Sequence, residues 1–441
     1  MTTVAIATLG CKVNQFESEA LTDSLEQRGY FLVPFGERAD ITIINTCTVT
    51  HRADFQSRQM VRRAVRSNPG SLVIVTGCYS QVDPDVSGKM DGVAYVLGNR
   101  EKARIPDLLP VLQQGGLPQV QVGNIQKETL FDEVVPYAFR RHTRAFLKIQ
   151  DGCNAYCSFC IVPHARGPSR SLSPERILEN LRRLKEKGFK EVVLTGIHIG
   201  AYGLDLVPAY SLERLLRRVE EEKTPQRIRL SSLEPLDFSK DLIHFLSKSS
   251  KICPHLHIPI QSGDDEILKK MNRNYSHSFL FDLIRKIHDT ISGVSIGADV
   301  IAGFPGETEE RFESTRELIE SLPFSYLHVF PFSKRKGTPA ATFPDHVDEA
   351  KIKTRAESLR ELSRKKRLAF YRQFLNQEVS VLIEGRRGKN SNPLKGLSRN
   401  YIPVLLPSVN GIDPKEWINQ ERTVRVTEVS EREVIGRIVE A

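Results

Sequence analysis

Residues 151–160 have the sequence DGCNAYCSFC, which places three of the chain's seven cysteines within ten positions. The apolar run RAFLKIQ before it, residues 144–150, is typical of a strand, so Cys153, Cys157 and Cys160 are predicted to lie in the loop that follows. Soft metals prefer thiolate ligands. Three cysteines at this spacing therefore favour a metal centre.

The residues alone leave three interpretations of this loop open. Zinc would need a fourth ligand, for which His164 is the candidate, and the cysteines would otherwise be buried structural thiols. A 4Fe–4S cluster is favoured, because thiolates hold its irons and three ligands leave one iron open to a substrate-like molecule. Cys253 is remote from the loop and is predicted to be a packed free thiol.

Strand-like and helix-like segments alternate on both sides of the loop. Before it, the runs TVAIATLG, ADITIINT and SLVIVTG are separated by amphipathic segments, which predicts a doubly wound parallel sheet in residues 1–125. After a linker around 123–143, six further strand-like runs separated by helices predict an open, partial (β/α)6 barrel in residues 140–374. One long basic helix over 348–374 is predicted to end this unit.

Residues 375–441 have a different character. Short β-like runs separated by turn residues predict a small all-β barrel or sandwich. These runs are EVSVLIEG, YIPVLLPS, RTVRVTEVS and REVIGRIVEA. The predicted fold is thus α/β with three domains.

Three further cysteines follow the predicted strands of the first domain. Cys11, Cys47 and Cys78 stand in TLGC, NTC and TGC. Because the carboxyl ends of parallel strands meet at the edge of a sheet where ligands bind, these thiols are expected to converge. We predict a second 4Fe–4S cluster there, again with one open iron.

The composition is that of a soluble protein, with 27% charged and 40% hydrophobic residues. A net charge of +9 suits either a polyanionic partner or a solvated surface. No run is long enough to span a membrane, and the few, odd-numbered cysteines indicate reduced thiols rather than a disulfide framework. We expect a cytoplasmic protein.

The spacing Cys-x3-Cys-x2-Cys after the first strand of a β/α series resembles that of radical S-adenosylmethionine (SAM) enzymes. Together with TLGCKVNQFESE, NTC, VTGC and GCNAYCSFCIVPHARGPSRS, the chain resembles the methylthiotransferase family over essentially its whole length. The resemblance implies two 4Fe–4S clusters, S-adenosylmethionine, and a C-terminal TRAM domain that binds tRNA. It also implies that sulfur arrives at the N-terminal cluster and that a second S-adenosylmethionine donates the methyl group.

The motifs GCK and LTGIH look most like the branch that modifies carbon 2 of N6-threonylcarbamoyladenosine beside the tRNA anticodon. The nearest alternative is the same chemistry on isopentenyladenosine or on a ribosomal-protein aspartate. An alternative of another class is an iron–sulfur tRNA-binding or electron-transfer protein without radical chemistry. The enzyme is expected to be monomeric. The sequence assigns no catalytic side chain, sulfur donor or reductant.

Polar residues at strand ends of the second domain should line its mouth. The resemblance implies that some of them contact the methionine or ribose part of S-adenosylmethionine. These residues are Ser231, Ser232, Glu234, Gln261 and Asp299. Arg166 and Arg170, just after the cysteine loop, either stabilise a carboxylate or phosphate or are solvated.

The stretch RRGKNSNPLKGLSRN, residues 386–400, is basic and contains no acidic residue. A run of one charge sign beside predicted strands is typical of contacts with nucleic-acid phosphates, although a solvated loop is the alternative. Its basic residues are Arg386, Arg387, Lys389, Lys395 and Arg399.

Overall fold

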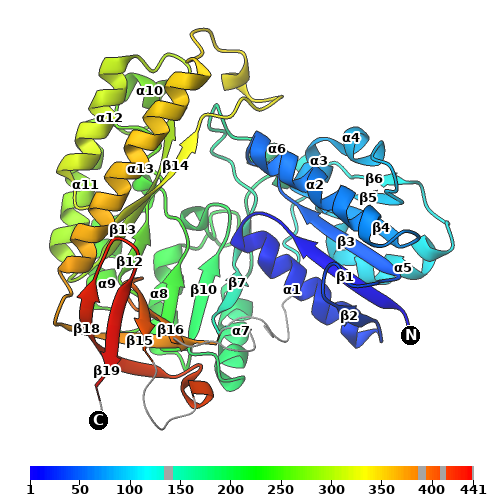
Figure 1. Ribbon diagram of the computed structural model, residues 1–441, viewed down its shortest axis with the longest axis horizontal. Coiled ribbons are helices and arrows are strands. Elements are labelled where there is room, and N and C mark those ends of the chain that lie inside the picture. The colour runs from blue at the N-terminus through cyan, green and yellow to red at the C-terminus, as the bar shows by residue number, and fades with distance from the viewer. Residues whose placement is uncertain (134–142, 386–393, 408–413, 440–441) are drawn as a thin grey trace.

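The structure is a computed structural model that describes residues 1–133, 143–385, 394–407 and 414–439. It confirms the predicted α/β class, with a parallel sheet, a partial barrel and a small β-barrel following one another along the chain (Figure 1). The domain boundaries proposed above stay a prediction. Within the described residues, no helix has the length and apolar character needed to cross a membrane.

The N-terminal unit is a six-stranded parallel sheet with the order β2-β1-β3-β4-β5-β6. Its strands are β1 (Thr3–Thr8), β2 (Phe31–Val33), β3 (Ile41–Thr46), β4 (Leu72–Gly77), β5 (Tyr95–Leu97) and β6 (Val120–Gln121). Its helices are α1 (Lys12–Gln27), α2 (His51–Ser67), α3 (Cys78–Val82), α4 (Pro84–Gly88) and α5 (Ile105–Gln113), with 3-10 turns η1 (Lys102–Arg104) and η2 (Ile125–Lys127). Helices α1 and α5 pack on one face and α2 on the other, so the sheet is doubly wound, as predicted.

The central unit contains six parallel strands in two three-stranded sheets, ordered β11-β10-β7 and β12-β13-β14. A bridge between Ile228 and Ile252 joins them into the predicted open barrel. The strands are β7 (Ala145–Lys148), β10 (Glu191–Thr195), β11 (Arg227–Leu230), β12 (His255–His257), β13 (Ser295–Ala302) and β14 (Tyr326–Pro331). A short hairpin pairs β8 (Gln150–Asp151) with β9 (Arg170–Ser171).

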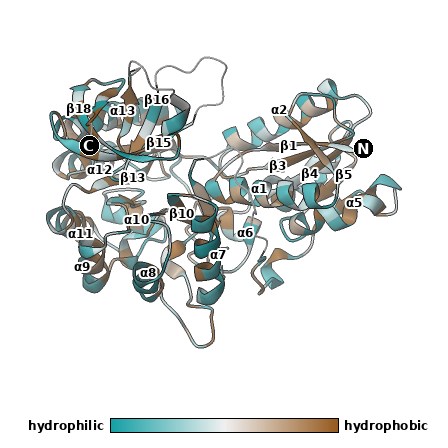
Figure 2. Cartoon of the chain, turned by 90° about the horizontal axis from the view of Figure 1, so that it is seen from below, coloured by the Kyte–Doolittle hydropathy of each residue, from teal (hydrophilic) through white to brown (hydrophobic). Residues whose placement is uncertain are grey.

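Helices cover the outside of this barrel. They are α6 (Val162–Arg166), α7 (Pro174–Glu186), α8 (Leu212–Glu221), α9 (Lys240–Lys248), α10 (Asp265–Lys270), α11 (His277–Thr290), α12 (Glu309–Ser321) and α13 (Glu349–Arg372), with turns η3 (Ile199–Ala201), η4 (Pro235–Asp237) and η5 (Pro339–Ala341). Ser173 is the N-cap of α7, as predicted, but its side chain makes no capping bond, so Pro174 at the first helical position favours this start. Figure 2 shows α7 and α8 as largely hydrophilic, because their apolar stripes face the barrel.

The C-terminal unit is a closed barrel with the order β15-β16-β17-β19-β18, as predicted. Its strands are β15 (Glu378–Glu384), β16 (Leu394–Ser398), β17 (Pro403–Leu406), β18 (Glu421–Val429) and β19 (Val434–Ile438), with turn η6 (Pro414–Trp417). The long basic helix expected over 348–374 is α13, which leads into this barrel.

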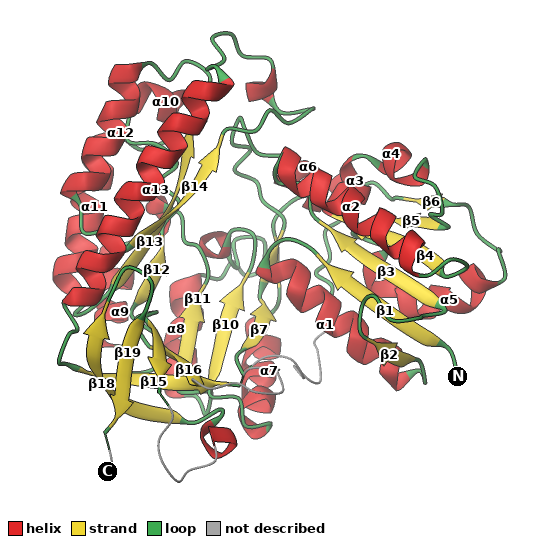
Figure 3. Cartoon of the chain, viewed as in Figure 1, coloured by secondary structure: helices red, strands yellow, loops and turns green. Residues whose placement is uncertain are grey.

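The direction of the strands shows which edge of the N-terminal sheet can carry a ligand site. Figure 3 shows the arrows of β7, β10 and β11 pointing the same way, while the arrows of β1 and β3 point toward the central unit. The carboxyl edge of the N-terminal sheet therefore faces the barrel, near α6. This is where ligands bind in open α/β sheets.

Candidate functional site

The three N-terminal cysteines lie at this edge of the first sheet. Cys11 precedes α1 after β1, Cys47 follows β3, and Cys78 opens α3 after β4. Since these strands are neighbours, the topology brings the three thiols together. Burial and the nearby Cys78 thiol raise the pKa of Cys47 to about 12, and Cys11 adds to the effect.

A glycine with a left-handed backbone precedes two of these cysteines. Gly10 has a φ of +99° and Gly77 one of +100°. A Cβ atom on Gly10 would lie 2.8 Å from the Cβ of Cys47, and one on Gly77 would lie 2.5 Å from the carbonyl oxygen of Thr46. Only glycine fits this conformation and space. The Gly-Cys pair therefore occurs at both positions. It is a second sequence signal for these cysteines, in addition to their position at the ends of predicted strands.

The second group of thiols lies in the loop between β8 and α6. Gly152 has a φ of +72°, and a Cβ atom there would lie 1.9 Å from the carbonyl oxygen of Pro168. Glycine is thus required before Cys153 as well. Cys157 is buried, whereas Cys153 and Cys160 are partly accessible.

Residues at the end of α10 hold this loop in place. The Nδ2 atom of Asn272 donates hydrogen bonds to the carbonyl oxygens of Ala155 at 3.2 Å and Tyr156 at 3.1 Å. The hydroxyl of Ser158 donates to the carbonyl oxygen of Lys270 at 2.7 Å. These partners are more than 110 residues apart in sequence, which is why sequence reasoning missed them.

His198 lies beside the same loop and was not singled out as a site residue from the sequence. Its Nε2 atom is 3.1 Å from Oδ2 of Asp237. Although burial opposes a charged imidazole, hydrogen bonds to Asp237 and to Cys153 raise the pKa of His198 to about 10. Asp237 in turn caps η4 by accepting a hydrogen bond from the backbone N–H of Glu234. This chain of contacts links β10 and β11 to the cysteine loop.

Arg166 joins α1, the helix that follows Cys11, to Asp151, which precedes the barrel cysteines. Its Nη1 atom donates to Oε1 of Glu17 at 2.8 Å and to Oδ1 of Asp151 at 3.0 Å, and its Nη2 atom donates to Oδ1 of Asn14 at 2.6 Å. The side chain is only 2% exposed. Arg166 was expected either to contact a carboxylate or phosphate or to be solvated, and the carboxylate contact is confirmed.

One further contact ties the first sheet to the barrel at this point. Asn99 Nδ2 donates to the carbonyl oxygen of Ala165 at 2.7 Å and lies 3.7 Å from Sγ of Cys78. Arg170 donates to the carbonyl oxygens of Arg166 and Pro168, and its Nη2 atom lies 3.9 Å from Oδ2 of Asp151, so it is buried beside a carboxylate rather than solvated.

The candidate residues for S-adenosylmethionine lie near the strand ends of the barrel, with one exception. Ser231 and Ser232 follow β11, and the Ser231 hydroxyl is buried without a hydrogen-bond partner among the described residues. Glu234 pairs with Arg273. Gln261 lies beyond β12, has a φ of +65° and bridges to β13. A buried polar atom without a partner suits a ligand.

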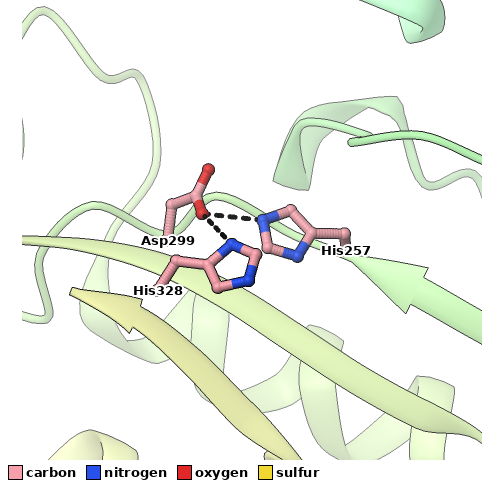
Figure 4. A group of neighbouring side chains, drawn as sticks. All are labelled: His257, Asp299 and His328. Atoms are coloured by element: carbon pink, nitrogen blue, oxygen red, sulfur yellow. Dashed lines mark hydrogen bonds and ion pairs between the residues drawn. The ribbon is translucent and has the colours of Figure 1, made fainter. Parts of the chain in front are cut away.

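Asp299 is the exception, because it was expected at a strand end. It is the fifth residue of β13, which continues to Ala302 through a buried apolar run. Its Oδ1 atom lies 2.8 Å from Nε2 of His257 and 3.2 Å from Nδ1 of His328 (Figure 4). Asp299 thus belongs to a cluster inside the barrel rather than to its rim.

The arrangement of donors bears on the choice of metal. In the described part of the chain, the three residues of Figure 4 form the one group of histidine, cysteine and acidic residues whose ligand atoms lie within 4.8 Å of one another. Neither set of cysteines meets this single-ion criterion, and His164 is exposed in a separate cavity of about 530 Å³. This disfavours zinc and fits a four-iron cluster, in which each thiolate binds a different iron. All seven cysteines are free, and Cys253 is buried, as predicted.

The basic stretch of the tail is only partly described. Arg386, Arg387 and Lys389 lie outside the described residues. Lys395 is on β16, so it stands on a strand rather than in a loop. Arg399 donates hydrogen bonds to the carbonyl oxygens of Gln226 at 3.1 Å and Ser250 at 2.5 Å. Arg399 therefore attaches the tail to the barrel through both terminal nitrogens of its guanidinium, which argues against the expected phosphate contact.

Comparison with known proteins identifies the family of the chain. Residues 147–319 match the model of the radical SAM superfamily, and residues 3–98 match that of the uncharacterized protein family UPF0004. The chain is 41% identical to the threonylcarbamoyladenosine tRNA methylthiotransferase MtaB of Bacillus subtilis, over 92% of this chain and 90% of that protein. The protein of the same name in Thermotoga maritima is 37% identical over 99% and 97%.

A more distant relative and a solved structure extend this comparison. The tRNA-2-methylthio-N(6)-dimethylallyladenosine synthase of Clostridium botulinum is 33% identical over 98% of this chain and 96% of that protein. A solved radical S-adenosylmethionine methyltransferase, TsrM from Kitasatospora setae, matches with a TM-score of 0.57 over 77% of both chains, and at 17% identity this shows the fold alone. The expected cofactors, S-adenosylmethionine and two 4Fe–4S clusters, are confirmed as those of the matched families. The chain belongs to the radical SAM superfamily and, within it, to the family of tRNA methylthiotransferases.

Proposed function

We propose that the protein converts N6-threonylcarbamoyladenosine next to the tRNA anticodon into its 2-methylthio derivative. The observation that carries this proposal is the presence of two sets of three free cysteines, one at the carboxyl ends of neighbouring strands of the first sheet and one in the loop after β8, in two units that the buried Arg166 joins. An electron-transfer protein has no need of three-cysteine sites that each leave one iron open. The relatives with the higher identities, 41% and 37%, are named for the threonylcarbamoyl acceptor.

Cys153, Cys157 and Cys160 would hold the cluster of the barrel, and Cys11, Cys47 and Cys78 that of the first sheet. When bound, the barrel cluster and S-adenosylmethionine supply a radical that removes hydrogen from an unactivated C–H bond, which no side-chain base ionises near neutral pH. Around them, Ser231, Glu234 and Gln261 are proposed to orient S-adenosylmethionine.

The acceptor brings a carboxylate, because its N6 substituent ends in threonine. Lys12 is the candidate partner, since it directly follows Cys11 at the start of α1 and forms no hydrogen bond or ion pair with any described residue. Burial and the guanidinium groups of Arg144 and Arg229 lower the pKa of Lys12 to about 8, so its surroundings are electropositive. A carboxylate relieves this repulsion, whereas a dimethylallyl group does not.

Lys12→Gln tests this assignment of the acceptor. The variant should lose at least tenfold in kcat/KM on tRNA carrying threonylcarbamoyladenosine, mainly through KM, which corresponds to about 1.4 kcal/mol. A tRNA whose threonyl carboxylate is methylated should be affected far less by the substitution. The exposed Lys185 on α7 provides the control variant, Lys185→Gln. Equal losses on both substrates would show that Lys12 does not contact the carboxylate.

The activity itself is tested by mass spectrometry of tRNA nucleosides from cells with and without the gene. Loss of 2-methylthio-N6-threonylcarbamoyladenosine supports the proposal, and loss of the isopentenyl derivative instead would assign the other acceptor. With purified, anaerobically reconstituted protein, replacing Cys153, Cys157 and Cys160 by Ala should halve the iron and abolish 5′-deoxyadenosine formation. Replacing Cys11, Cys47 and Cys78 should halve the iron and keep that cleavage, but yield no methylthio product.

A further inference from the structure

Three side chains of the barrel wall meet at one point in its interior. His257 ends β12, Asp299 lies in β13 and His328 lies in β14, and these three parallel strands are neighbours. Asp299 and His328 are register partners, so their side chains leave the sheet on the same face. Figure 4 shows both imidazole rings directed at the Asp299 carboxylate.

The distances suit the coordination shell of one ion. Oδ1 of Asp299 lies 2.8 Å from Nε2 of His257 and 3.2 Å from Nδ1 of His328. Ligand atoms around a four-coordinate zinc ion are about 3.3 Å apart, because Zn–N and Zn–O bonds are about 2.0–2.2 Å long. An ion thus requires only small side-chain adjustments.

A second layer of contacts supports this geometry. The hydroxyl of Tyr326 lies 3.3 Å from Nδ1 of His257, so it can hold that nitrogen and leave Nε2 directed at Asp299. Ligating histidines almost always have such a partner on their other ring nitrogen. Tyr326 in turn lies over Gly297, where a Cβ atom would come within 2.4 Å of the hydroxyl oxygen. The tyrosine contacts a second ring as well, because Nε2 of His255 lies 2.8 Å from its oxygen.

The three side chains differ in their exposure to solvent. The His257 side chain is 10% exposed, Asp299 is 23% exposed and His328 is 57% exposed. An ion can therefore enter past His328, and three protein ligands leave a coordination position open. We propose that His257, Asp299 and His328 form a binding site for one divalent first-row transition metal ion, of the two-histidine, one-carboxylate kind that Zn²⁺ and Fe²⁺ favour.

The test is zinc binding by calorimetry to the reconstituted protein, whose cysteines are occupied by the clusters, after loosely held metal has been removed. The parent should bind one Zn²⁺. Asp299→Asn and His328→Gln should each weaken that binding at least tenfold. Tyr326→Phe should weaken it about 10–100-fold, as for other second-layer partners. His288→Gln is the matched control, because His288 pairs with Asp289 at 3.2 Å on the outer helix α11.

Each outcome of this experiment either supports or contradicts the proposed metal site. His328 is the most exposed of the three ligands, so its replacement carries the least risk to folding, and retained iron content with an unchanged circular dichroism spectrum verifies each variant. Absence of zinc binding by the parent would reduce the group to a hydrogen-bonded cluster and overturn the proposal. Equal binding by the parent and the Asp299 and His328 variants would place the ion elsewhere. The experiment needs neither tRNA nor turnover, so it does not depend on the proposed function.

Discussion

The barrel holds its two neighbours through buried arginines, but the acceptors differ. On the side of the first sheet, Arg166 is neutralised by the carboxylates of Glu17 and Asp151, which come from different structural units. Lys102 also pairs with Glu17, and Lys148 pairs with both carboxylates. This interface is a network of buried charges.

On the side of the C-terminal barrel, the arginines mainly contact backbone. Arg227 and Arg229 donate hydrogen bonds to the carbonyl oxygens of β16 and the residue after it, and share Glu191, which belongs to the barrel itself. The accepting residues are Leu397, Ser398 and Arg399. The tail also contributes two carboxylates, because Glu421 accepts from Arg227 at 2.9 Å and Glu384 from Arg144 at 2.7 Å, so this interface combines backbone acceptors with ion pairs. The first interface couples stability to the cluster site, and the second only positions a binding module.

Breaking the first interface should have the largest effect. Arg166→Gln leaves Glu17 and Asp151 buried with one cation fewer, and removing one partner of a buried pair costs about 3–5 kcal/mol. Urea unfolding followed by circular dichroism measures the loss, and iron content should fall with it. The exposed pair of Arg28 and Asp107, 2.6 Å apart, gives the control, because Arg28→Gln should cost less than about 1 kcal/mol. A cost below 1 kcal/mol for Arg166→Gln would mean that the charge network does not hold the units together.

The second interface should respond to acid through Glu191. Although burial opposes its ionisation, Arg229 and Arg227 lower the pKa of this carboxyl from an ordinary 4.5 to about 2. The stabilisation is therefore complete above pH 4.5 and is lost as the pH falls toward 2, by about 3 kcal/mol at 1.36 kcal/mol per pKa unit.

Hydrogen exchange of the β16 amides, measured from pH 5 to pH 3, reports this loss locally. The amides should become less protected as the pH falls. Glu191→Gln should show weak protection that no longer changes over this range. Protection in the parent that stays constant down to pH 3 would contradict the shifted pKa.

The same contrast explains what the sequence could predict. The barrel cysteines are visible as one motif because they share a loop of eight residues, from Cys153 to Cys160. Cys11, Cys47 and Cys78 needed a topological argument, which worked because a parallel sheet fixes where its strands end. The contact of Arg166 with Glu17 spans 149 residues and leaves no local pattern, so composition and periodicity cannot reveal it.

Asp299 shows the limit of the strand-end argument. Asp299 was counted among the polar residues at strand ends, but Val300 and Ala302 are buried in the same core and extend β13 beyond it. Tertiary burial, rather than turn residues, decides where this strand ends. The identification of Arg399 as a phosphate contact failed for a related reason. A charge in a basic run is solvated only if no neighbouring unit offers acceptors, and here two backbone carbonyls do.

The smallest expected effect concerns tRNA affinity, and it separates Lys395 from Arg399. Each phosphate contact contributes roughly 0.7–0.9 to the slope of log affinity against log salt, because neutralised phosphates release counterions. Replacing Arg387 and Lys395 by Ala should flatten this slope by roughly one to two units. Arg399→Ala should leave the slope nearly unchanged and instead weaken the protection of β16, because this arginine is bound to the barrel. Replacing Lys240 and Lys286, exposed on α9 and α11, removes the same charge and should do neither. A slope that responds to Arg399 and not to Lys395 would reverse the assignment and make the tail interface part of the tRNA surface.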